Sequence, residues 1–343
     1  MIEPLRTTIP ALTLAQHISQ QQRELRATGE FSAVLGHISL AGRVIAEALS
    51  HSGLFGRITT GNHQDAQADA QRMDLLAKET FVNIFKHSPW APTLLLAEEI
   101  DQEVPMHNRV KGGKYVVFCD ALDGAPNLAV NGVVGSIFGI YRRVDSEEAV
   151  TQDDVLQKGA ELAGAGYIMY GPSTVMVFSS GDAVNAYTLD PGIGDFLVTE
   201  QNIHIPERGL SYSANEANYH DWHDFLRRYI DHLRKRDPKS DKYYASRYSG
   251  SLIADFHRML MQGGIYICPG DCRNPDRPVG KRLLMYECNP LAYIAEQAGG
   301  GATTGTERIL KIKPKEIKHR TPLVIGSPYE VLLYEDFATG RRQ

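Results

Sequence analysis

Two short apolar runs, each ending in acidic residues, constrain the fold of this chain most strongly. TLLLAEE (93–99) and KYVVFCDAL (114–122) have the length and composition of strands buried inside a sheet. The first run ends in Glu98 and Glu99, and the second carries Asp120 near its end, with Asp123 just beyond it. Sheets in α/β proteins place their functional residues at strand ends. The two runs therefore predict an α/β protein with an acidic site at the edge of a sheet.

Further helices and strands are expected in the N-terminal half. Apolar residues at helical spacing predict helices over 31–49 and 72–87, and the glycine-rich segment 51–70, which lacks periodicity, predicts a mobile loop. Short strand-like segments joined by Gly, Pro and Ser predict a sheet over 136–143, 166–170, 174–180 and 183–190.

A polar connection over 200–215 separates this half from a second α/β unit. We expect helices over 221–236, 251–264, 291–300 and 328–340, and strands over 264–268, 282–287 and 321–327. The sequence therefore predicts two α/β halves, 1–205 and 206–343.

The composition is that of a globular protein. Of the 343 residues 43% are hydrophobic, and the net charge of −5 gives no basic field that would hold nucleic acid. The sequence contains no apolar run of the ~18 residues that a membrane span requires, and its N-terminus lacks the pattern of a signal peptide. Cys119, Cys268, Cys272 and Cys288 lack zinc-finger spacing, which favours reduced thiols. We expect a cytoplasmic protein that binds neither nucleic acid nor membranes.

Six acidic residues lie at predicted strand ends and helix starts: Asp74, Glu98, Glu99, Asp120, Asp123 and Glu287. Carboxylates are the ligands that Mg²⁺ prefers, and it often pairs them with a substrate phosphate. Asp120 and Asp123, with the carbonyl of Leu122 between them, could flank two ions that clamp a phosphoryl group. Each acid also has a plainer interpretation, since Glu98 and Glu99 could lie in a solvated loop and Glu287 could be satisfied by backbone amides.

The strand-end motifs resemble one family. LLLAEE, GKYVVFCDALDG, GSIFGIYRR, SRYSGSLIADFHR and GKRLLMYECNPLAYIAEQAGG are similar to segments of the class I fructose-1,6-bisphosphatases, in the same order, from 28–30 to 320–326. The DALDG motif alone would fit the wider lithium-sensitive sugar and inositol phosphatase superfamily, and the YECNPLAYIAEQAGG block narrows the resemblance. The resemblance implies an α-β-α-β-α layered sugar phosphatase architecture with two mixed sheets. It also implies a homotetramer that hydrolyses the 1-phosphate of fructose 1,6-bisphosphate in gluconeogenesis or the Calvin cycle.

The resemblance assigns roles to particular residues. The metal ligands would be Glu98, Asp120, Leu122 (through its carbonyl), Asp123 and Glu287, holding two or three Mg²⁺ ions, with Mn²⁺ or Zn²⁺ as alternatives. The catalytic residues that help to generate the attacking water would be Asp74 and Glu99. The substrate would contact Asp123, Gly124, Ala125, Asn215, Tyr219, Arg247, Tyr248 and Lys281. The acid that the family has six residues before Asp74 is Ala68 here, with Asp69 as the neighbouring substitute, so the third ion has the least support.

The resemblance also implies an AMP-inhibition site distant from the catalytic residues. Its positions match Thr28, Gly29, Glu30, Ser32, Lys114, Tyr115 and Arg142. Backbone amides at a helix N-terminus bind phosphate well. The plainer interpretation is that Thr28 and Ser32 cap the helix and that Lys114 is solvated.

The chain departs from the family where substrate phosphates would bind. The family reads DGSSN where this chain reads DGAPN, so Ala125 lacks a hydroxyl and Pro126 lacks a backbone N–H. A hydrogen bond to a charged group contributes ~1.5–3 kcal/mol, so each lost donor would weaken binding about tenfold to a hundredfold. Proline is nevertheless tolerated in the first turn of a helix, so the backbone there can be retained.

The C-terminal half departs as well. Cys268 replaces a tyrosine of the family, and the segment 268–280 is longer than its counterpart. The family's arginine at position 283 is Leu283 here, with Arg282 before it, and strand alternation predicts that the arginine points the other way. These departures leave two alternatives open: a phosphatase for another sugar bisphosphate such as sedoheptulose 1,7-bisphosphate, or a catalytically weakened regulatory homologue. The detailed match of the second half disfavours an inositol-type monophosphatase.

Overall fold

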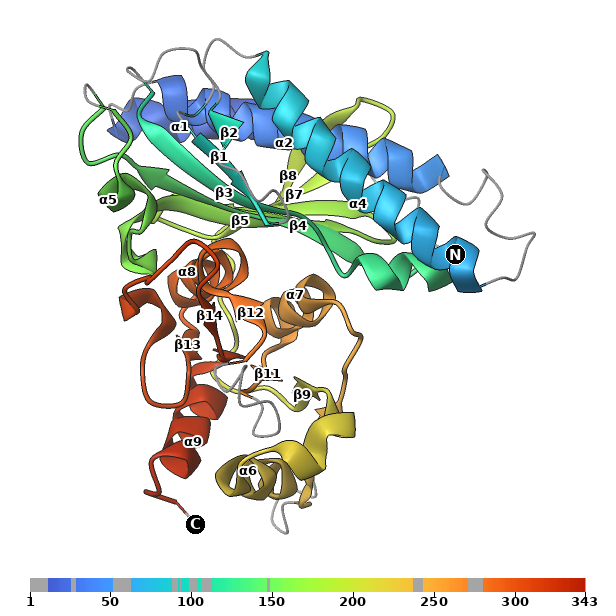
Figure 1. Ribbon diagram of the computed structural model, residues 1–343, viewed down its shortest axis with the longest axis vertical. Coiled ribbons are helices and arrows are strands. Elements are labelled where there is room, and N and C mark those ends of the chain that lie inside the picture. Colours follow the sequence, from blue (N-terminus) through green and yellow to red (C-terminus); the bar gives the residue numbers. More distant parts are fainter. Residues whose placement is uncertain are drawn as a thin grey trace, which may run out of the picture.

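Helices and sheets alternate in five layers along the long axis of the molecule (Figure 1). The computed structural model describes residues 12–25, 29–51, 63–87, 92, 94–98, 104–105, 113–146, 149–236, 243–270 and 280–342. Helices α1, α2 and α4 cover the outer face of a large sheet, α7 and α8 lie between the two sheets, and α6 and α9 pack on the smaller sheet. The predicted α-β-α-β-α architecture with two mixed sheets is confirmed.

The outer helix layer comprises α1 (Leu14–Leu25), α2 (Gly29–His51) and α4 (His63–Lys86). The helix predicted over 31–49 is confirmed as α2. The loop predicted over 51–70 is wrong for 63–70, which form the first turns of α4, and residues 52–62 lie outside the described part of the chain. By length and composition alone, helix α2 is long and apolar enough to cross a membrane, but its buried face packs on the large sheet, as in a core helix of a globular protein.

The large sheet has the strand order β2-β1-β3-β4-β5-β6-β7-β8. Its strands are β1 (Leu94–Ala97), β2 (Val104–Pro105), β3 (Tyr115–Asp123), β4 (Val134–Arg142), β5 (Leu162–Tyr170), β6 (Thr174–Ser179), β7 (Asn185–Asp190) and β8 (Asp195–Glu200). Strands β1 and β3 are parallel, and the pairs from β3 to β8 are antiparallel. Every residue of β3 is buried, because helices cover both faces of the sheet there. Short helices flank these strands: η2 (Ala125–Val130), α5 (Gln152–Val155) and η3 (Gly159–Glu161).

The second half is built around a five-stranded mixed sheet in the order β10-β9-β11-β15-β13. Its strands are β9 (Ser211–Ala214), β10 (Ala245–Ser246), β11 (Ile265–Cys268), β13 (Gly301–Thr303) and β15 (Leu323–Gly326). Its helices are η4 (Glu216–Asp221), α6 (Asp224–Arg234), α7 (Leu252–Gln262), α8 (Asn289–Gln297), η6 (Ile309–Lys311) and α9 (Pro328–Ala338).

The strand predicted over 282–287 is largely wrong. Strand β12 (Arg282–Leu283) is two residues long and pairs only with β14 (Arg320–Thr321) within the described residues. The next five residues form a π-helical turn, η5 (Leu284–Cys288), that continues into α8. Pro290 lies in the first turn of α8, where proline favours helix initiation, so the apolar run enters a helix rather than a longer strand.

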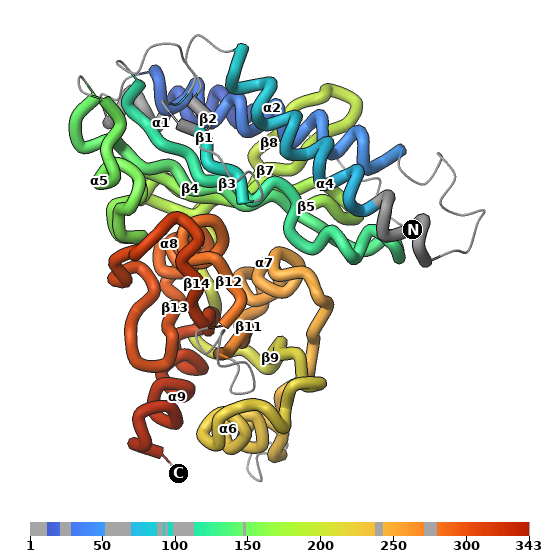
Figure 2. Tube along the Cα trace, viewed as in Figure 1, coloured from blue at the N-terminus to red at the C-terminus, as the bar shows by residue number. Residues whose placement is uncertain are grey.

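The two halves share one hydrophobic core beneath β3, β4 and β5. The rings of Phe118 on β3 and Tyr286 on η5 meet edge to face with centroids 5.2 Å apart. Tyr167 on β5 and Phe256 on α7 do the same at 5.6 Å. Figure 2 shows the trace of α7 and α8 returning to lie against these strands. The acidic end of β3 is therefore held between residues from both halves.

Candidate active site

The carboxylates of Asp120, Asp123 and Glu287 converge at the end of β3. One ligand oxygen from each lies within 4.8 Å of the others, and all three residues are buried. In a regular strand, residues three apart point to opposite faces. The pairing of β3 with β4 shifts register between Asp120 and Asp123, and this irregularity brings both side chains to one site. Glu287 reaches the site from η5, whose turn begins immediately after β12.

Glu98 joins this cluster from the end of β1, where its backbone N–H donates to Cys119 O at 3.1 Å. Burial, followed by the charges of Glu287 and Asp123, raises the pKa of Glu98 to about 7. Burial and the neighbouring acids, Glu98 foremost, raise the pKa of Asp120 well above its usual value. Burial likewise raises the pKa of Asp123. Clustered, buried oxygen ligands of this kind fit a hard divalent cation, because a cation offsets both their repulsion and their desolvation.

Arg282 points into this acidic cluster. Its Nη1 lies 2.5 Å from Glu287 Oε1 and 3.4 Å from Asp123 Oδ1, and its Nη2 donates to Tyr266 Oη at 2.9 Å. Leu283 instead lies in the core with 1% of its surface exposed. Residues 282 and 283 point opposite ways, as strand alternation predicts, and Arg282 is the one of the two that contacts the acids. In the two-residue strand β12, the first residue therefore faces the acids and the second faces the core.

A cavity of about 560 Å³ opens beside the acids. It is lined by Ala70, Gln71, Asp74, Lys78, Glu98, Asp120, Leu122, Asp123, Gly124, Ala125, Pro126, Ala129, Arg282 and Glu287. Asp74 reaches it from α4 and forms an ion pair with Lys78 one turn along the helix, a partner that sequence reasoning missed. Glu99 lies outside the described residues, as do the side chains of Ala68 and Asp69.

The first four residues of the DGAPN segment, Asp123 to Pro126, line this cavity. Gly124 adopts a left-handed conformation with φ of 77° and precedes the short helix η2, which has Pro126 in its first turn. The expectation that proline is compatible with the local backbone is therefore confirmed. A side chain at Gly124 would also press on Ser251, because a Cβ there would lie 3.1 Å from Ser251 Oγ.

Asp123 is also bound by the start of α7, a contact that the sequence did not reveal. Its Oδ2 accepts hydrogen bonds from the backbone N–H of Ile253 at 3.1 Å and from Ser251 Oγ at 3.3 Å. These donors come from the C-terminal half, so the acidic site depends on both halves of the chain.

A second cavity of about 200 Å³ lies in the C-terminal half. Its lining includes Asn215, Tyr248 and Lys281 among the predicted substrate residues, together with Cys268 and Tyr266. Tyr266 contacts Arg282, which lines the first cavity, so the two cavities are neighbours.

Two predicted substrate residues do not line either cavity. Tyr219 donates its hydroxyl to Asp231 at 2.8 Å, and the guanidinium of Arg234 lies over its ring at 5.2 Å. Arg247 is exposed, and its backbone N–H donates to Tyr212 O at 2.8 Å.

The predicted AMP residues gather at the start of α2. Lys114 Nζ lies 3.0 Å from Glu30 Oε1, and Tyr115 and Arg142 are direct partners across β3 and β4. Gly29 and Ser32 lie in the first turn of α2, and Thr28 lies outside the described residues.

Comparisons with known proteins agree with this geometry. The family model described as fructose-1-6-bisphosphatase, N-terminal domain, matches residues 12–201, and the corresponding C-terminal domain model matches residues 205–339. The chain is 40% identical to a fructose-1,6-bisphosphatase class 1 of Chloroherpeton thalassium over 334 residues, covering 96% of this chain and 94% of that one. It is also 40% identical to a fructose-1,6-bisphosphatase class 1 of Microcystis aeruginosa over 333 residues, covering 96% and 93%.

A solved structure gives the same result at the level of the fold. The crystal structure of Leishmania major fructose-1,6-bisphosphatase in holo form superposes with a TM-score of 0.85 at 33% identity, covering 95% of this chain and 98% of that one. Both domain models match in order and cover most of the chain. The chain therefore belongs to the fructose-1,6-bisphosphatase class 1 family.

Proposed function

We propose that this chain is a Mg²⁺-dependent phosphatase that hydrolyses the 1-phosphate of fructose 1,6-bisphosphate, yielding fructose 6-phosphate and phosphate. The observation that carries the proposal is the cluster of buried carboxylates beside a cavity of about 560 Å³. An adjoining cavity contains Lys281, a cation suited to a second phosphate. Two neighbouring cavities suit a substrate with a phosphate at each end, and membership of the family supports the same reaction.

Each side chain has a proposed role in this reaction. Glu98, Asp120, Asp123, Glu287 and the Leu122 carbonyl would hold the divalent ions. When bound, these ions would stabilise the charge on the transferred phosphate and lower the pKa of a bound water.

The remaining residues would move a proton and orient the substrate. Asp74, supported by Glu99, would accept the proton from the attacking water, and the adjacent Lys78 fixes the position of the Asp74 carboxylate. The turn at Gly124 and Ala125 would hold the 1-phosphate. At the other end, Asn215, Tyr248 and Lys281 would bind the sugar and the 6-phosphate.

The decisive test compares phosphate release by the wild-type chain and by Asp120→Asn, with and without Mg²⁺. The substitution keeps the shape of the side chain and removes its charge, so the fold should persist while hydrolysis falls to background. Asp182→Asn, at an exposed acid that lines neither cavity, is the matched control. Hydrolysis by the Asp120→Asn variant, or hydrolysis that does not depend on a divalent ion, would contradict the proposed mechanism.

A specific observation favours a second candidate substrate. Cys268, which stands where the family has a tyrosine, lines the cavity proposed for the far phosphate. A different sugar bisphosphate, such as sedoheptulose 1,7-bisphosphate, would meet this altered surface. A substrate panel decides, because the highest kcat/KM for fructose 1,6-bisphosphate would eliminate this candidate. Ala125, which lacks a hydroxyl, and Pro126, which lacks a backbone N–H, suggest a third alternative, a catalytically weakened homologue. Robust turnover of any of these substrates would eliminate it.

We further propose that AMP binds at the start of α2 as an inhibitor, and that the chain forms a cytoplasmic homotetramer. The ion pair of Glu30 with Lys114 and the pairing of Tyr115 with Arg142 support the AMP site. Inhibition by AMP that is lost in Lys114→Met would support it. Sedimentation analysis would determine the number of subunits.

A further inference from the structure

Asp255 on α7 is a fully buried carboxylate to which none of these roles assigns a function. We propose that Asp255 is a positioning residue: it fixes the segment 247–251, which contains Tyr248, to the same helix that binds Asp123. The two cavities would thereby keep a constant separation. This inference rests on the proposed role of the second cavity in binding the far phosphate.

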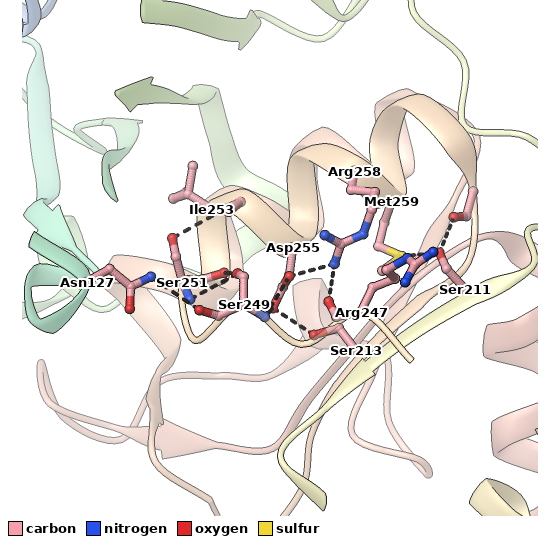
Figure 3. Close-up of polar contacts among 12 residues, drawn as sticks. Asn127, Ser211, Ser213, Arg247, Ser249, Ser251, Ile253, Asp255, Arg258 and Met259 are labelled. Carbon is pink, nitrogen blue, oxygen red and sulfur yellow. Dashed lines mark hydrogen bonds and ion pairs between the residues drawn. The ribbon is translucent and has the colours of Figure 1, made fainter. Parts of the chain in front are cut away.

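The carboxylate of Asp255 collects donors from three separate elements (Figure 3). Ser213 on β9 donates its hydroxyl to Oδ2 at 2.7 Å. The backbone N–H of Ser249 donates to both oxygens, at 3.2 and 3.1 Å. Arg258, one turn along α7, donates from Nη2 to Oδ1 at 2.6 Å. A buried carboxylate with this many partners fixes the positions of all of them.

Arg258 extends this contact to the residue before Tyr248. The same Nη2 atom that binds Asp255 also donates to the carbonyl oxygen of Arg247. The carbonyl at 247 and the N–H at 249 are therefore both held by the pair of Asp255 and Arg258. Tyr248 lies between these two anchors, and its ring lines the second cavity.

The other end of α7 is anchored to the acidic site. Ser251 caps the helix by accepting from the N–H of Ala254 at 3.3 Å, and the same hydroxyl donates to Asp123. Asn127 on η2 adds a second link, because its side-chain amide donates to the carbonyl of Ser249 at 3.3 Å. Figure 3 shows Asn127, Ser249, Ser251 and Asp255 close together at the start of α7.

The geometry therefore connects Asp123 to Tyr248 through one rigid unit. Asp123 is fixed to the first turn of α7, and Asp255 in that same turn fixes the backbone on either side of Tyr248. Residues 247–250 are exposed and include Gly250 in a left-handed conformation with φ of 83°, so the contacts with Asp255 and Arg258 are what tie this segment to α7.

The substitution Asp255→Asn tests the inference. An asparagine of the same shape has one acceptor oxygen, so it cannot serve Ser213, Ser249 and Arg258 together. We expect kcat/KM for fructose 1,6-bisphosphate to fall about tenfold to a hundredfold, mainly through KM. The kcat/KM for fructose 1-phosphate, which lacks the far phosphate, should change little. The preference for the bisphosphate is the readout, because a general structural defect would lower both values equally.

Three further variants make the result unambiguous. Arg258→Met, at a side chain that is 24% exposed, removes the bond to Arg247 and should lower the same preference even if Asp255→Asn fails to fold. Lys281→Met tests the second cavity independently of α7. Asp224→Asn, at an acid with 76% of its side chain exposed, is the control that should match the wild type.

The outcomes separate the inference from the function on which it rests. A reduced preference in Asp255→Asn or Arg258→Met, and also in Lys281→Met, supports the inference. If Lys281→Met lowers the preference while both α7 variants leave it unchanged, or reduce the two substrates equally, the positioning role is overturned and the proposed function stands. If Lys281→Met leaves the preference unchanged, the far-phosphate assignment fails and the inference fails with it.

Discussion

Arg282 places a permanent positive charge among carboxylates that otherwise repel one another. Its guanidinium pairs with Glu287 and Asp123 while only 13% of its side chain is exposed. Removing one partner of a buried ion pair leaves the other uncompensated, at a cost of about 3–5 kcal/mol. The arginine therefore stabilises the acidic site when no metal ion is bound, and it also lies beside the position where a metal would bind.

This arrangement predicts a metal-dependent stability defect in Arg282→Met. In EDTA, the variant should have a lower Tm than the wild type, because Glu287 and Asp123 lose the cation that pairs with both of them. Adding Mn²⁺ or Mg²⁺ should raise the Tm of the variant more than that of the wild type, since the ion then supplies the missing charge. Thermal unfolding followed by circular dichroism measures both values.

A matched arginine controls for the loss of a surface charge. Arg308→Met removes an ion pair between a half-exposed arginine and Glu296, away from the acidic site, and its Tm should shift little and equally in EDTA and in metal. An Arg282→Met variant whose Tm deficit is the same with and without metal would contradict the idea that the arginine and the ion stabilise the same carboxylates.

At the scale of elements, sequence patterns predicted the helices and strands whose apolar residues recur with a clear period. They missed helix α1 and the first turns of helix α4, which lack such a period. Helix α1 carries few apolar residues, but its start has a capping box: Gln16 N–H donates to Thr13 Oγ1 at 3.2 Å, and Thr13 N–H donates to Gln16 Oε1 at 3.0 Å. That T-x-x-Q signature is present in the sequence and could have located the helix. The first turns of α4 are polar, so an argument from apolar spacing reads them as a loop.

The sequence predicted which acidic residues form the site better than it predicted how the fold brings them together. Residue type and position at strand ends pointed to Glu98, Asp120, Asp123 and Glu287, which the structure brings together. The register shift that turns Asp120 and Asp123 to one side has no sequence signature. The donors to Asp123 from the start of α7 lie 128 and 130 residues from it along the chain, so local reasoning could not find them.

The contact between β5 and α7 predicts a pH dependence of stability. His257 Nδ1 lies 2.8 Å from Tyr167 Oη, and burial lowers the pKa of His257 below its usual 6.5. The unfolded chain therefore binds this proton at a higher pH than the native one. The free energy of unfolding should fall as the pH decreases below about 6.5, by at most ~1.4 kcal/mol per pH unit from this group, until the folded pKa is reached.

His257→Gln isolates this contribution, because glutamine can still accept from Tyr167 but does not titrate. Urea unfolding at pH 7.5 and 5.5 should show a smaller loss of stability in this variant than in the wild type. The same substitution at the exposed His204 serves as the control. An identical pH dependence in His257→Gln and the wild type would show that the β5–α7 contact does not carry this effect.

At the scale of the whole molecule, the two halves share one of their hydrophobic core clusters, while each also has a cluster of its own. One core cluster combines Val116 and Ile137 of the large sheet with Leu252, Met259 and Leu291 of the C-terminal helices. Helices α7 and α8 bury one face against the large sheet and the other against the small sheet. Separating the halves would expose the large sheet and the face of α7 and α8 that packs on it, so this shared cluster would be lost from both halves.

This shared core predicts a single cooperative unfolding transition for the full chain. Phe256 is fully buried on α7 and packs against Tyr167 of the other half, and replacing a buried phenylalanine by alanine costs about 3–5 kcal/mol. In calorimetry, Phe256→Ala should move the whole transition to lower temperature without splitting it, because the contact that it weakens belongs to both halves. A fragment of residues 1–204 should accordingly fail to fold into a cooperative unit. Two resolved transitions, with only the later or the earlier one displaced in Phe256→Ala, would show instead that the halves unfold independently.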